Sequence, residues 1–171
     1  MKEEGRKDDK GKHPALYNYY EGISILVSSA AAPASLPGAD ARNVVRYAEL
    51  GGICLHIATN EDIEDKILML SDLFFDIAQC PLFNVSELTV PELLRDISWV
   101  CKHGADKYAL LNYRNLDPLR CLSALMRHAG TILLDDDFTD SESGLPHISH
   151  ILANILILAE IYQLKSDGEC V

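Results

Sequence analysis

The chain has 171 residues, of which 48% are hydrophobic, and its formal net charge at pH 7 is −11. This length fits one domain with a modest extension, and this apolar fraction is sufficient for a buried core. The strong negative charge argues against a protein that binds nucleic-acid backbones in general, because such binding requires clustered lysine and arginine side chains.

The cysteines and the apolar runs indicate the compartment. Five cysteines are widely spaced and form no Cys-x-x-Cys pair, which favours a reducing environment. Residues 1–13 mix both charges with glycine, so they predict a flexible arm rather than a secretory signal. The longest apolar run, Ile151 to Ile161, is interrupted by polar residues and is too short to span a bilayer. We therefore expect a soluble, cytoplasmic protein that contacts no membrane.

The first helix is expected from Pro14 to about Ala31, where apolar residues recur at helical spacing. A break rich in proline follows it and includes one glycine. After this break, Asp40 can cap a second helix that is expected to run to about Thr59.

The third and fourth expected helices carry clear start and stop signals. The third has the most regular apolar pattern in the chain and is predicted to begin at an Asn60 N-cap. It should end near Cys80, because the proline that follows disfavours helical geometry there. Thr89 and Glu92 form the pattern of a capping box, which opens a fourth helix that is expected to end around Gly104.

The last two expected helices complete an all-α fold. Asp117 and Pro118 suit the start of a fifth helix, which fades into the acidic stretch 135–137. The sixth helix is expected from near Pro146 to about Leu164. No run alternates over enough residues to predict a sheet, so we expect an α-helical bundle.

Histidines and acids concentrate around the junction of the fifth and sixth helices. Between residues 101 and 150 lie four histidines and a dense run of acids: His103, His128, His147, His150, Asp135, Asp136, Asp137, Asp140 and Glu142. At helical spacing, His147, His150 and Asn154 share one face of the sixth helix. They are either hydrogen-bonded core residues or part of a metal or phosphate site. The acidic run is likewise either a solvated loop or a source of oxygen ligands for Mg²⁺ or Mn²⁺.

Two basic elements have the same pair of interpretations. Arg127 and His128 lie in an otherwise apolar helix and form either a solvated helix edge or a partner for an anion. Lys7, Lys10 and Lys12 are either a solubilising tail or a flexible clamp over a phosphate. The chain lacks a P-loop, a Rossmann glycine fingerprint and a Gly-x-Ser-x-Gly elbow.

Three blocks of the sequence resemble a known family. They are GADKYALLNYRN (104–115), ALMRH (124–128) and DSESGLPHISHILAN (140–154). In this order and spacing they look like the dATP/dGTP diphosphohydrolase-like family of phage and bacterial proteins, which is similar to the MazG-like all-α nucleotide pyrophosphohydrolases. The segment KDDKGK (7–12) also resembles an N-terminal element of that family.

The chain departs from the family pattern at several positions. Tyr113 stands where the family usually has tryptophan, and Asp135-Asp136 replaces Gly-Glu. Ser141 replaces proline, and Ile151 replaces alanine. The carboxylate at Asp136 is one carbon shorter than that of the family glutamate, which changes its reach toward a metal ion.

The resemblance implies an organisation in three parts. Residues 1–13 are the flexible arm, residues 14–88 are a helical extension or insertion, and residues 89–171 are the nucleotide pyrophosphohydrolase-like core. The implied architecture is a MazG-like helical bundle with an additional N-terminal helical segment. Such proteins commonly form homo-oligomers, so a dimer or tetramer is expected, in the host cytoplasm if the gene belongs to a phage.

The resemblance also implies a metal-dependent enzyme that hydrolyses purine (deoxy)nucleoside triphosphates, such as dGTP or dATP, to a monophosphate and pyrophosphate. The implied ligands of Mg²⁺ or Mn²⁺ are Asp96, Asp136, Asp140, Glu142, His150 and Asn154. Three of these carboxylates, Asp136, Asp140 and Glu142, are implied to activate water. The implied phosphate contacts are Lys12, Lys107, Arg127 and His128, and the implied base or sugar contacts are Asn112 and Tyr113. The alternatives are a catalytically silent nucleotide-binding module and an oligomeric helical interaction protein.

Overall fold

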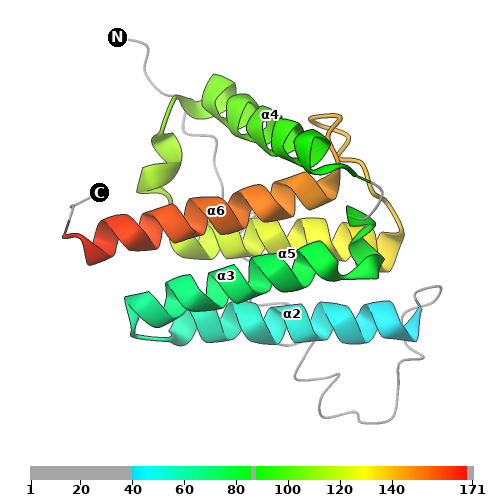
Figure 1. The fold of residues 1–171 in the computed structure, drawn as a ribbon, viewed down its shortest axis with the longest axis horizontal. Coiled ribbons are helices and arrows are strands. Elements are labelled where there is room, and N and C mark those ends of the chain that lie inside the picture. The colour runs from blue at the N-terminus through cyan, green and yellow to red at the C-terminus, as the bar shows by residue number, and fades with distance from the viewer. Residues whose placement is uncertain (1–39, 86–87, 169–171) are drawn as a thin grey trace.

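A computed structural model describes residues 40–85 and 88–168, which form an all-α bundle as predicted (Figure 1). Its long helices are α2 (Ala41–Thr59), α3 (Ile63–Gln79), α4 (Val90–Tyr108), α5 (Pro118–Asp135) and α6 (His147–Ser166). Short 3-10 turns are η2 (Pro81–Phe83) and η4 (Asn112–Asn115). In the described ranges the β-type pairing is an isolated bridge between Thr139 and Pro146. The expected arm and the helix over 14–31 lie outside the described residues.

Local capping explains where three of the helices begin. The carboxylates of Asp40 and Asp117 each accept a hydrogen bond from a backbone N–H in the first turn of α2 and α5. Thr89 and Glu92 form a capping box at the start of α4, in which each side chain accepts a hydrogen bond from the backbone N–H of the other. These predicted starts are confirmed.

The predicted N-cap of the third helix is wrong. Asp62 caps α3, and its carboxylate accepts hydrogen bonds from two N–H groups of the first turn. Asn60 instead terminates α2, and its side-chain oxygen accepts a hydrogen bond from the N–H of Asp62. Both residues are suitable caps, and the aspartate lies where its charge meets the positive end of the helix dipole.

The predicted end of the fourth helix is also wrong. α4 continues past Gly104 to Tyr108 and ends where Ala109 adopts a φ of 130°. A glycine inside a helix weakens it by about 1 kcal/mol without forcing it to stop. An ion pair between Lys102 and Asp106, four residues apart, spans the glycine and supports the continued helix.

The bundle is organised around α6, which packs against α3, α4 and α5, while α2 packs against α5. In Figure 1, α4 lies on the opposite side of α6 from α2. One buried core takes side chains from all five helices, including Ile57, Leu70, Ile97, Leu125 and Ile151. The described helices of the segment 14–88 therefore share the core of the C-terminal helices.

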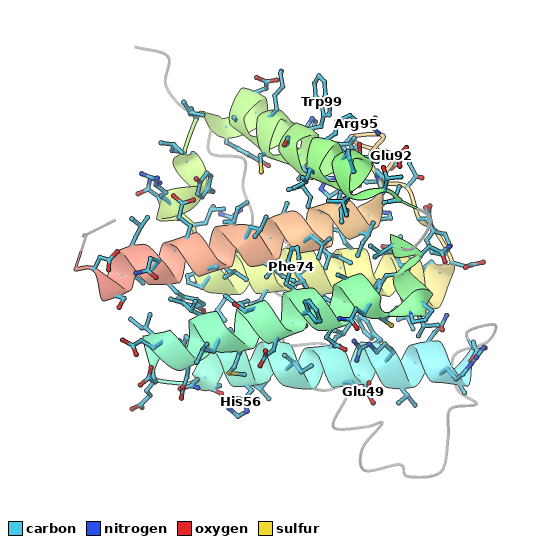
Figure 2. All side chains as sticks on the ribbon, in the orientation of Figure 1. Glu49, His56, Phe74, Glu92, Arg95 and Trp99 are labelled. Carbon is cyan, nitrogen blue, oxygen red and sulfur yellow. The ribbon has the colours of Figure 1, made fainter. Side chains whose placement is uncertain are left out.

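The composition of α6 follows from this central position. It is long and apolar enough to cross a membrane by length and composition, but 56% of its apolar window is buried inside the bundle. In contrast to the central α6, α4 has a side that faces away from the other helices, and Figure 2 shows Glu92, Arg95 and Trp99 on that side. Trp99 is 51% exposed.

Candidate active site

A group of partly buried polar side chains lies where α5, the loop over 136–146 and the first turns of α6 meet. The loop folds back on itself through backbone hydrogen bonds from Asp140 N–H to Leu145 O (2.9 Å) and from Gly144 N–H to Asp140 O (2.8 Å). Gly144 has a φ of +71°, a conformation that favours glycine. This turn directs the Asp140 side chain toward the histidines of α5 and α6.

Three imidazole rings lie together at this junction. The Nδ1 atoms of His128 on α5 and His147 on α6 are 2.7 Å apart. The rings of His128 and His150 are stacked, with their centroids 4.5 Å apart and their planes inclined by 18°. His147 is 6% exposed, and the other two rings are partly buried.

Asp140 is held against this histidine cluster by Ser143. The Ser143 N–H and Oγ donate hydrogen bonds to Asp140 Oδ2 over 2.9 Å and 2.7 Å. The same Oγ lies 2.8 Å from His150 Nε2, and Asp140 Oδ2 is 3.7 Å from that nitrogen. Because the hydroxyl proton is directed to Asp140, the ring nitrogen of His150 is assigned as the donor to Oγ.

The environment favours the neutral forms of His128 and His150 and an ionised Asp140. Burial, reinforced by the neighbouring His150 and His147, lowers the pKa of His128 to about 3. Burial also lowers the pKa of His150. Burial raises the pKa of Asp140, but the hydrogen bonds from Ser143 outweigh it, so the pKa lies below its ordinary value. At neutral pH the site therefore offers the neutral rings of His128 and His150 and a carboxylate.

These groups have the chemistry of a cation site. One ligand atom from each of His128, Asp140 and His147 lies within 4.8 Å of the others, and this is the group of metal-ligating side chains found among the described residues. Neutral imidazole and carboxylate are the usual protein ligands of divalent transition metals. Three protein ligands leave further coordination positions for water or phosphate.

A second charged pair lies beside the cluster. Lys107, at the end of α4, forms an ion pair with Glu142 in the loop. The hydrogen bond between Lys107 and Glu142 lowers the pKa of Glu142 and raises the pKa of Lys107. Both side chains are accessible to solvent, so an arriving anion or cation can separate them.

The structure brings some of the predicted site residues together. Asp140, His150 and His128 lie in one cluster, and Lys107 meets Glu142 next to it. The side-chain amide of Asn154 donates to the carbonyl of His150 over 2.8 Å, one turn earlier on α6. These residues come from α4, α5, α6 and the loop between the last two.

Other predicted site residues lie elsewhere. Asp96 is buried on α4 with its carboxylate 3.1 Å from Arg95 Nε, and Asp136 is exposed at the end of α5. Arg127 lies on the exposed side of α5. Asn112 lies in η4, and Lys12 is outside the described residues.

Tyr113, predicted to meet the base or sugar, lies at the far end of α6 from the cluster. Its hydroxyl donates to Glu160 Oε2 over 2.7 Å, and Arg114 Nη2 lies 2.6 Å from Oε1 of the same carboxylate. His147 and Glu160 are about 20 Å apart along α6 at the usual helical rise. Tyr113 therefore anchors η4 to α6 in the structure.

Sequence reasoning left two members of the cluster out of the predicted site. His147 is predicted to share a helix face with His150 but is not among the implied ligands, and its partner His128 is 19 residues away. Ser143 carries a usable signal, since a serine three residues after an aspartate is a common turn pattern. The sequence pattern does not reveal that α5 packs against α6, which is what brings His128 to His147.

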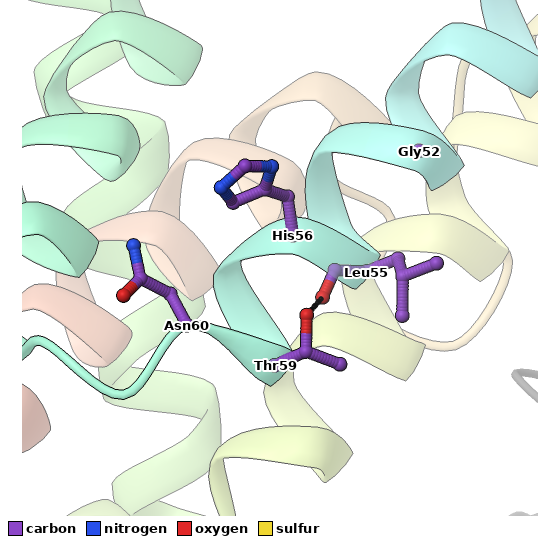
Figure 3. Close-up of a pocket in the computed structure, with 5 residues that line it drawn as sticks. All are labelled: Gly52, Leu55, His56, Thr59 and Asn60. Atoms are coloured by element: carbon purple, nitrogen blue, oxygen red, sulfur yellow. Dashed lines mark hydrogen bonds between the residues drawn. The ribbon is translucent and has the colours of Figure 1, made fainter.

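The hollows of the described surface include one on α2 and one beside the cluster. The first lies on the C-terminal half of α2 and is lined by Gly52, Leu55, His56, Thr59 and Asn60 (Figure 3). Its Thr59 hydroxyl donates to the Leu55 carbonyl, so this polar group is already satisfied. The second has a volume of about 170 Å³, lies between α4 and the loop, and is lined by Trp99, Lys102, His103, Asp106, Ser143 and Leu145. Ser143 joins this second hollow to the cluster.

Comparison with known proteins gives a family match over the part of the chain that contains the cluster. A family model described as "dATP/dGTP diphosphohydrolase, N-terminal" matches residues 82–169, which is more than half of the chain. No curated protein and no solved structure matches the chain. The match includes α4, α5, α6 and the acidic loop.

Proposed function

The chain belongs to the dATP/dGTP diphosphohydrolase N-terminal family, and on this premise we propose that it hydrolyses purine (deoxy)nucleoside triphosphates such as dGTP or dATP. The products are a nucleoside monophosphate and pyrophosphate, and the reaction depends on a divalent cation such as Mg²⁺ or Mn²⁺. The family name implies a diphosphohydrolase activity. The single observation that supports a site for it is the convergence of Asp140, His128 and His147 beside the Lys107–Glu142 pair.

The donor set fits a divalent cation. Asp140 is ionised and oriented by Ser143, which are the properties that a carboxylate ligand requires. When bound, the cation neutralises charge on the phosphates and lowers the pKa of a bound water.

Lys107 and Glu142 have complementary roles in this proposal. The substrate phosphates attract the Lys107 ammonium away from Glu142, and Lys107 then stabilises the charge that develops on the leaving pyrophosphate. Glu142, released from its cation, regains basicity, because the ion pair is what holds its pKa down. It accepts the proton of the attacking water as the bond from the α-phosphorus to the bridging oxygen breaks.

The hollow beside Ser143 is the proposed entry for the triphosphate. Lys102 and His103 in its wall offer donors to phosphate oxygens, and the half-exposed ring of Trp99 at its edge provides an apolar surface. The proposed assembly is a dimer or tetramer, and a partner subunit would complete the walls of this shallow hollow.

The test is an assay of ribo- and deoxynucleoside triphosphates with Mg²⁺ or Mn²⁺ that resolves pyrophosphate from orthophosphate. We expect pyrophosphate release, strongest with a purine deoxynucleotide, and its loss in Glu142→Gln, which removes the base with little change in shape. Glu64→Gln, an exposed position on α3, is the matched control and should retain wild-type turnover.

Two outcomes would favour the alternatives. Nucleotide binding without metal-dependent turnover indicates a catalytically silent module. A ligand at a hundred times its dissociation constant adds about 2.7 kcal/mol to the free energy of unfolding. Failure of every nucleotide to stabilise the protein therefore indicates an oligomeric interaction protein.

A further inference from the structure

We propose that His128, His147 and Asp140 form a site for a divalent transition-metal ion, of the class Mn²⁺, Co²⁺ or Zn²⁺, with two imidazole nitrogens and one carboxylate oxygen as ligands. As the source of the catalytic cation this site rests on the proposed function. As a binding site it is testable without any nucleotide.

The contact between the two Nδ1 atoms is the first argument. Two ring nitrogens 2.7 Å apart repel each other unless one of them donates a proton to the lone pair of the other, so in the metal-free protein one Nδ1–H is shared between the two rings. When the donating ring carries its proton on Nε2 instead, both Nδ1 lone pairs are available to a divalent cation. With metal–nitrogen bonds of about 2.0–2.1 Å in tetrahedral geometry, the two nitrogens lie about 3.3 Å apart, so the rings need to separate by about 0.6 Å.

The third ligand is already oriented. Both hydrogen bonds from Ser143 go to Asp140 Oδ2, and they hold the carboxylate at the cluster. Since both of these hydrogen bonds go to Oδ2, the lone pairs of Oδ1 are available to a cation. Oriented carboxylates of this kind are typical of metal sites with a supporting second layer.

His150 provides that support. It stacks on His128 and is held in place through Ser143, so it restricts the ring orientation of one ligand and the position of another. Asn154 donates to the backbone carbonyl of His150 and adds to the local order. The three proposed ligands are therefore surrounded by supporting residues, His150, Ser143 and Asn154, which an isolated histidine pair would lack.

The donor types select the class of metal. Mg²⁺ prefers oxygen ligands in near-octahedral geometry and retains its waters, whereas imidazole suits later divalent metals. Two nitrogens and one oxygen therefore disfavour Mg²⁺ relative to Mn²⁺, Co²⁺ and Zn²⁺. The open coordination positions lie where water or a phosphate oxygen can enter.

The test is a titration of the full, chelator-stripped chain with Co²⁺, followed by its visible ligand-field absorption. We expect one Co²⁺ per chain, displacement by Zn²⁺, and no displacement by a large excess of Mg²⁺. His128→Asn and His147→Asn should raise the dissociation constant by about tenfold or more. His56→Asn, an exposed histidine on α2, is the matched control and should bind Co²⁺ as the wild type does.

His147 is buried, so the His147→Asn variant can lose Co²⁺ binding because it unfolds. Asp140→Asn is nearly isosteric and should stay folded, so a loss of Co²⁺ binding in this variant reports the loss of a ligand. A folded Asp140→Asn protein with an unchanged Co²⁺ dissociation constant would overturn the proposal. So would the lack of any Co²⁺ absorption, or equal competition by Mg²⁺ and Zn²⁺. Co²⁺ binding without nucleotide hydrolysis would contradict the proposed function alone, and hydrolysis with Mg²⁺ in a chain that binds no Co²⁺ would contradict the metal site alone.

Discussion

Two of the places in the described bundle where polar side chains are enclosed between helices differ in how those side chains are paired. Between α2 and α3, the Arg46 guanidinium, only 15% exposed, pairs with Asp76 and lies 3.3 Å from Glu49. Between α5 and α6, histidine side chains face one another, and a single carboxylate accompanies them. The first place pairs its cation with carboxylates of the same chain, whereas the second brings ligand atoms of three residues within 4.8 Å of one another. The difference distinguishes a structural ion pair from a site that is open to a ligand.

The comparison requires that the two places belong to one cooperative fold, and Ile57→Ala tests this. Ile57 of α2 is fully buried, so the cavity should lower the free energy of unfolding by about 2–5 kcal/mol. Fluorescence of Trp99 on α4 and far-UV circular dichroism should report one shared, shifted denaturant midpoint. Val45→Ala, at a 54% exposed position of α2, is the control. A Trp99 transition that stays at the wild-type midpoint would indicate that α2 and α3 fold as a separate unit.

Ser143→Ala tests whether orientation of Asp140 and His150 matters for function. Loss of this hydroxyl should reduce turnover by about 10- to 100-fold and raise the metal concentration needed for half-maximal rate. Ser143→Thr, which keeps the hydroxyl, should restore the metal dependence. Ser71→Ala on α3, where the hydroxyl meets only a backbone carbonyl of its own helix, serves as control. An unchanged metal dependence in Ser143→Ala would mean that Ser143 has only a structural role.

Asp76→Asn tests the charge balance between α2 and α3. Arg46 then retains only Glu49, and the free energy of unfolding should fall by about 1–2 kcal/mol, because a charge-assisted hydrogen bond is lost. Turnover should remain at the wild-type value. Asp72→Asn makes the same change of net charge at an exposed position of α3 and should leave stability unchanged. The idea fails if both variants unfold at the same denaturant concentration.

Gly52→Ala has the smallest expected effect and acts on the layer away from the cluster. Gly52 is an exposed helical residue of α2, and a Cβ atom there meets nothing within 4 Å. The substitution should raise the free energy of unfolding by about 0.5–1 kcal/mol without changing turnover. Gly130→Ala on α5 is the contrast, since its Cβ would lie 3.2 Å from the Tyr47 ring. Equal stabilisation by both substitutions would contradict the packing between α2 and α5.

The helix boundaries were predictable where interactions between residues close in sequence determine them. Asp40, Asp117 and the Thr89/Glu92 box act within one turn of chain, so their identity is sufficient to place a helix start. Prediction was wrong where two local signals competed. Asn60 and Asp62 are both suitable caps, and Gly104 suits a helix end but is also tolerated inside a helix.

The candidate site was predictable only along single helices. The spacing of His147 and His150 places them on one face of α6, and the family blocks indicate the acidic loop and Lys107 as functional. The pairing of His128 with His147 joins two helices, and the pairing of Lys107 with Glu142 joins a helix to the loop. Such contacts depend on which helix faces pack and in which register, and no short window of sequence encodes that.

The sequence by itself determined that the chain is all-α, that its acids and histidines gather near residues 101–150, and that it resembles the family to which it belongs. Periodicity, capping and ordered motifs are local properties, so one sequence is sufficient to reveal them. Only the tertiary structure decided that α2 and α3 share the core and that His128, Asp140 and His147 converge. Burial of the apolar faces fixes how the helices pack, and that packing places side chains from different helices within bonding distance of one another.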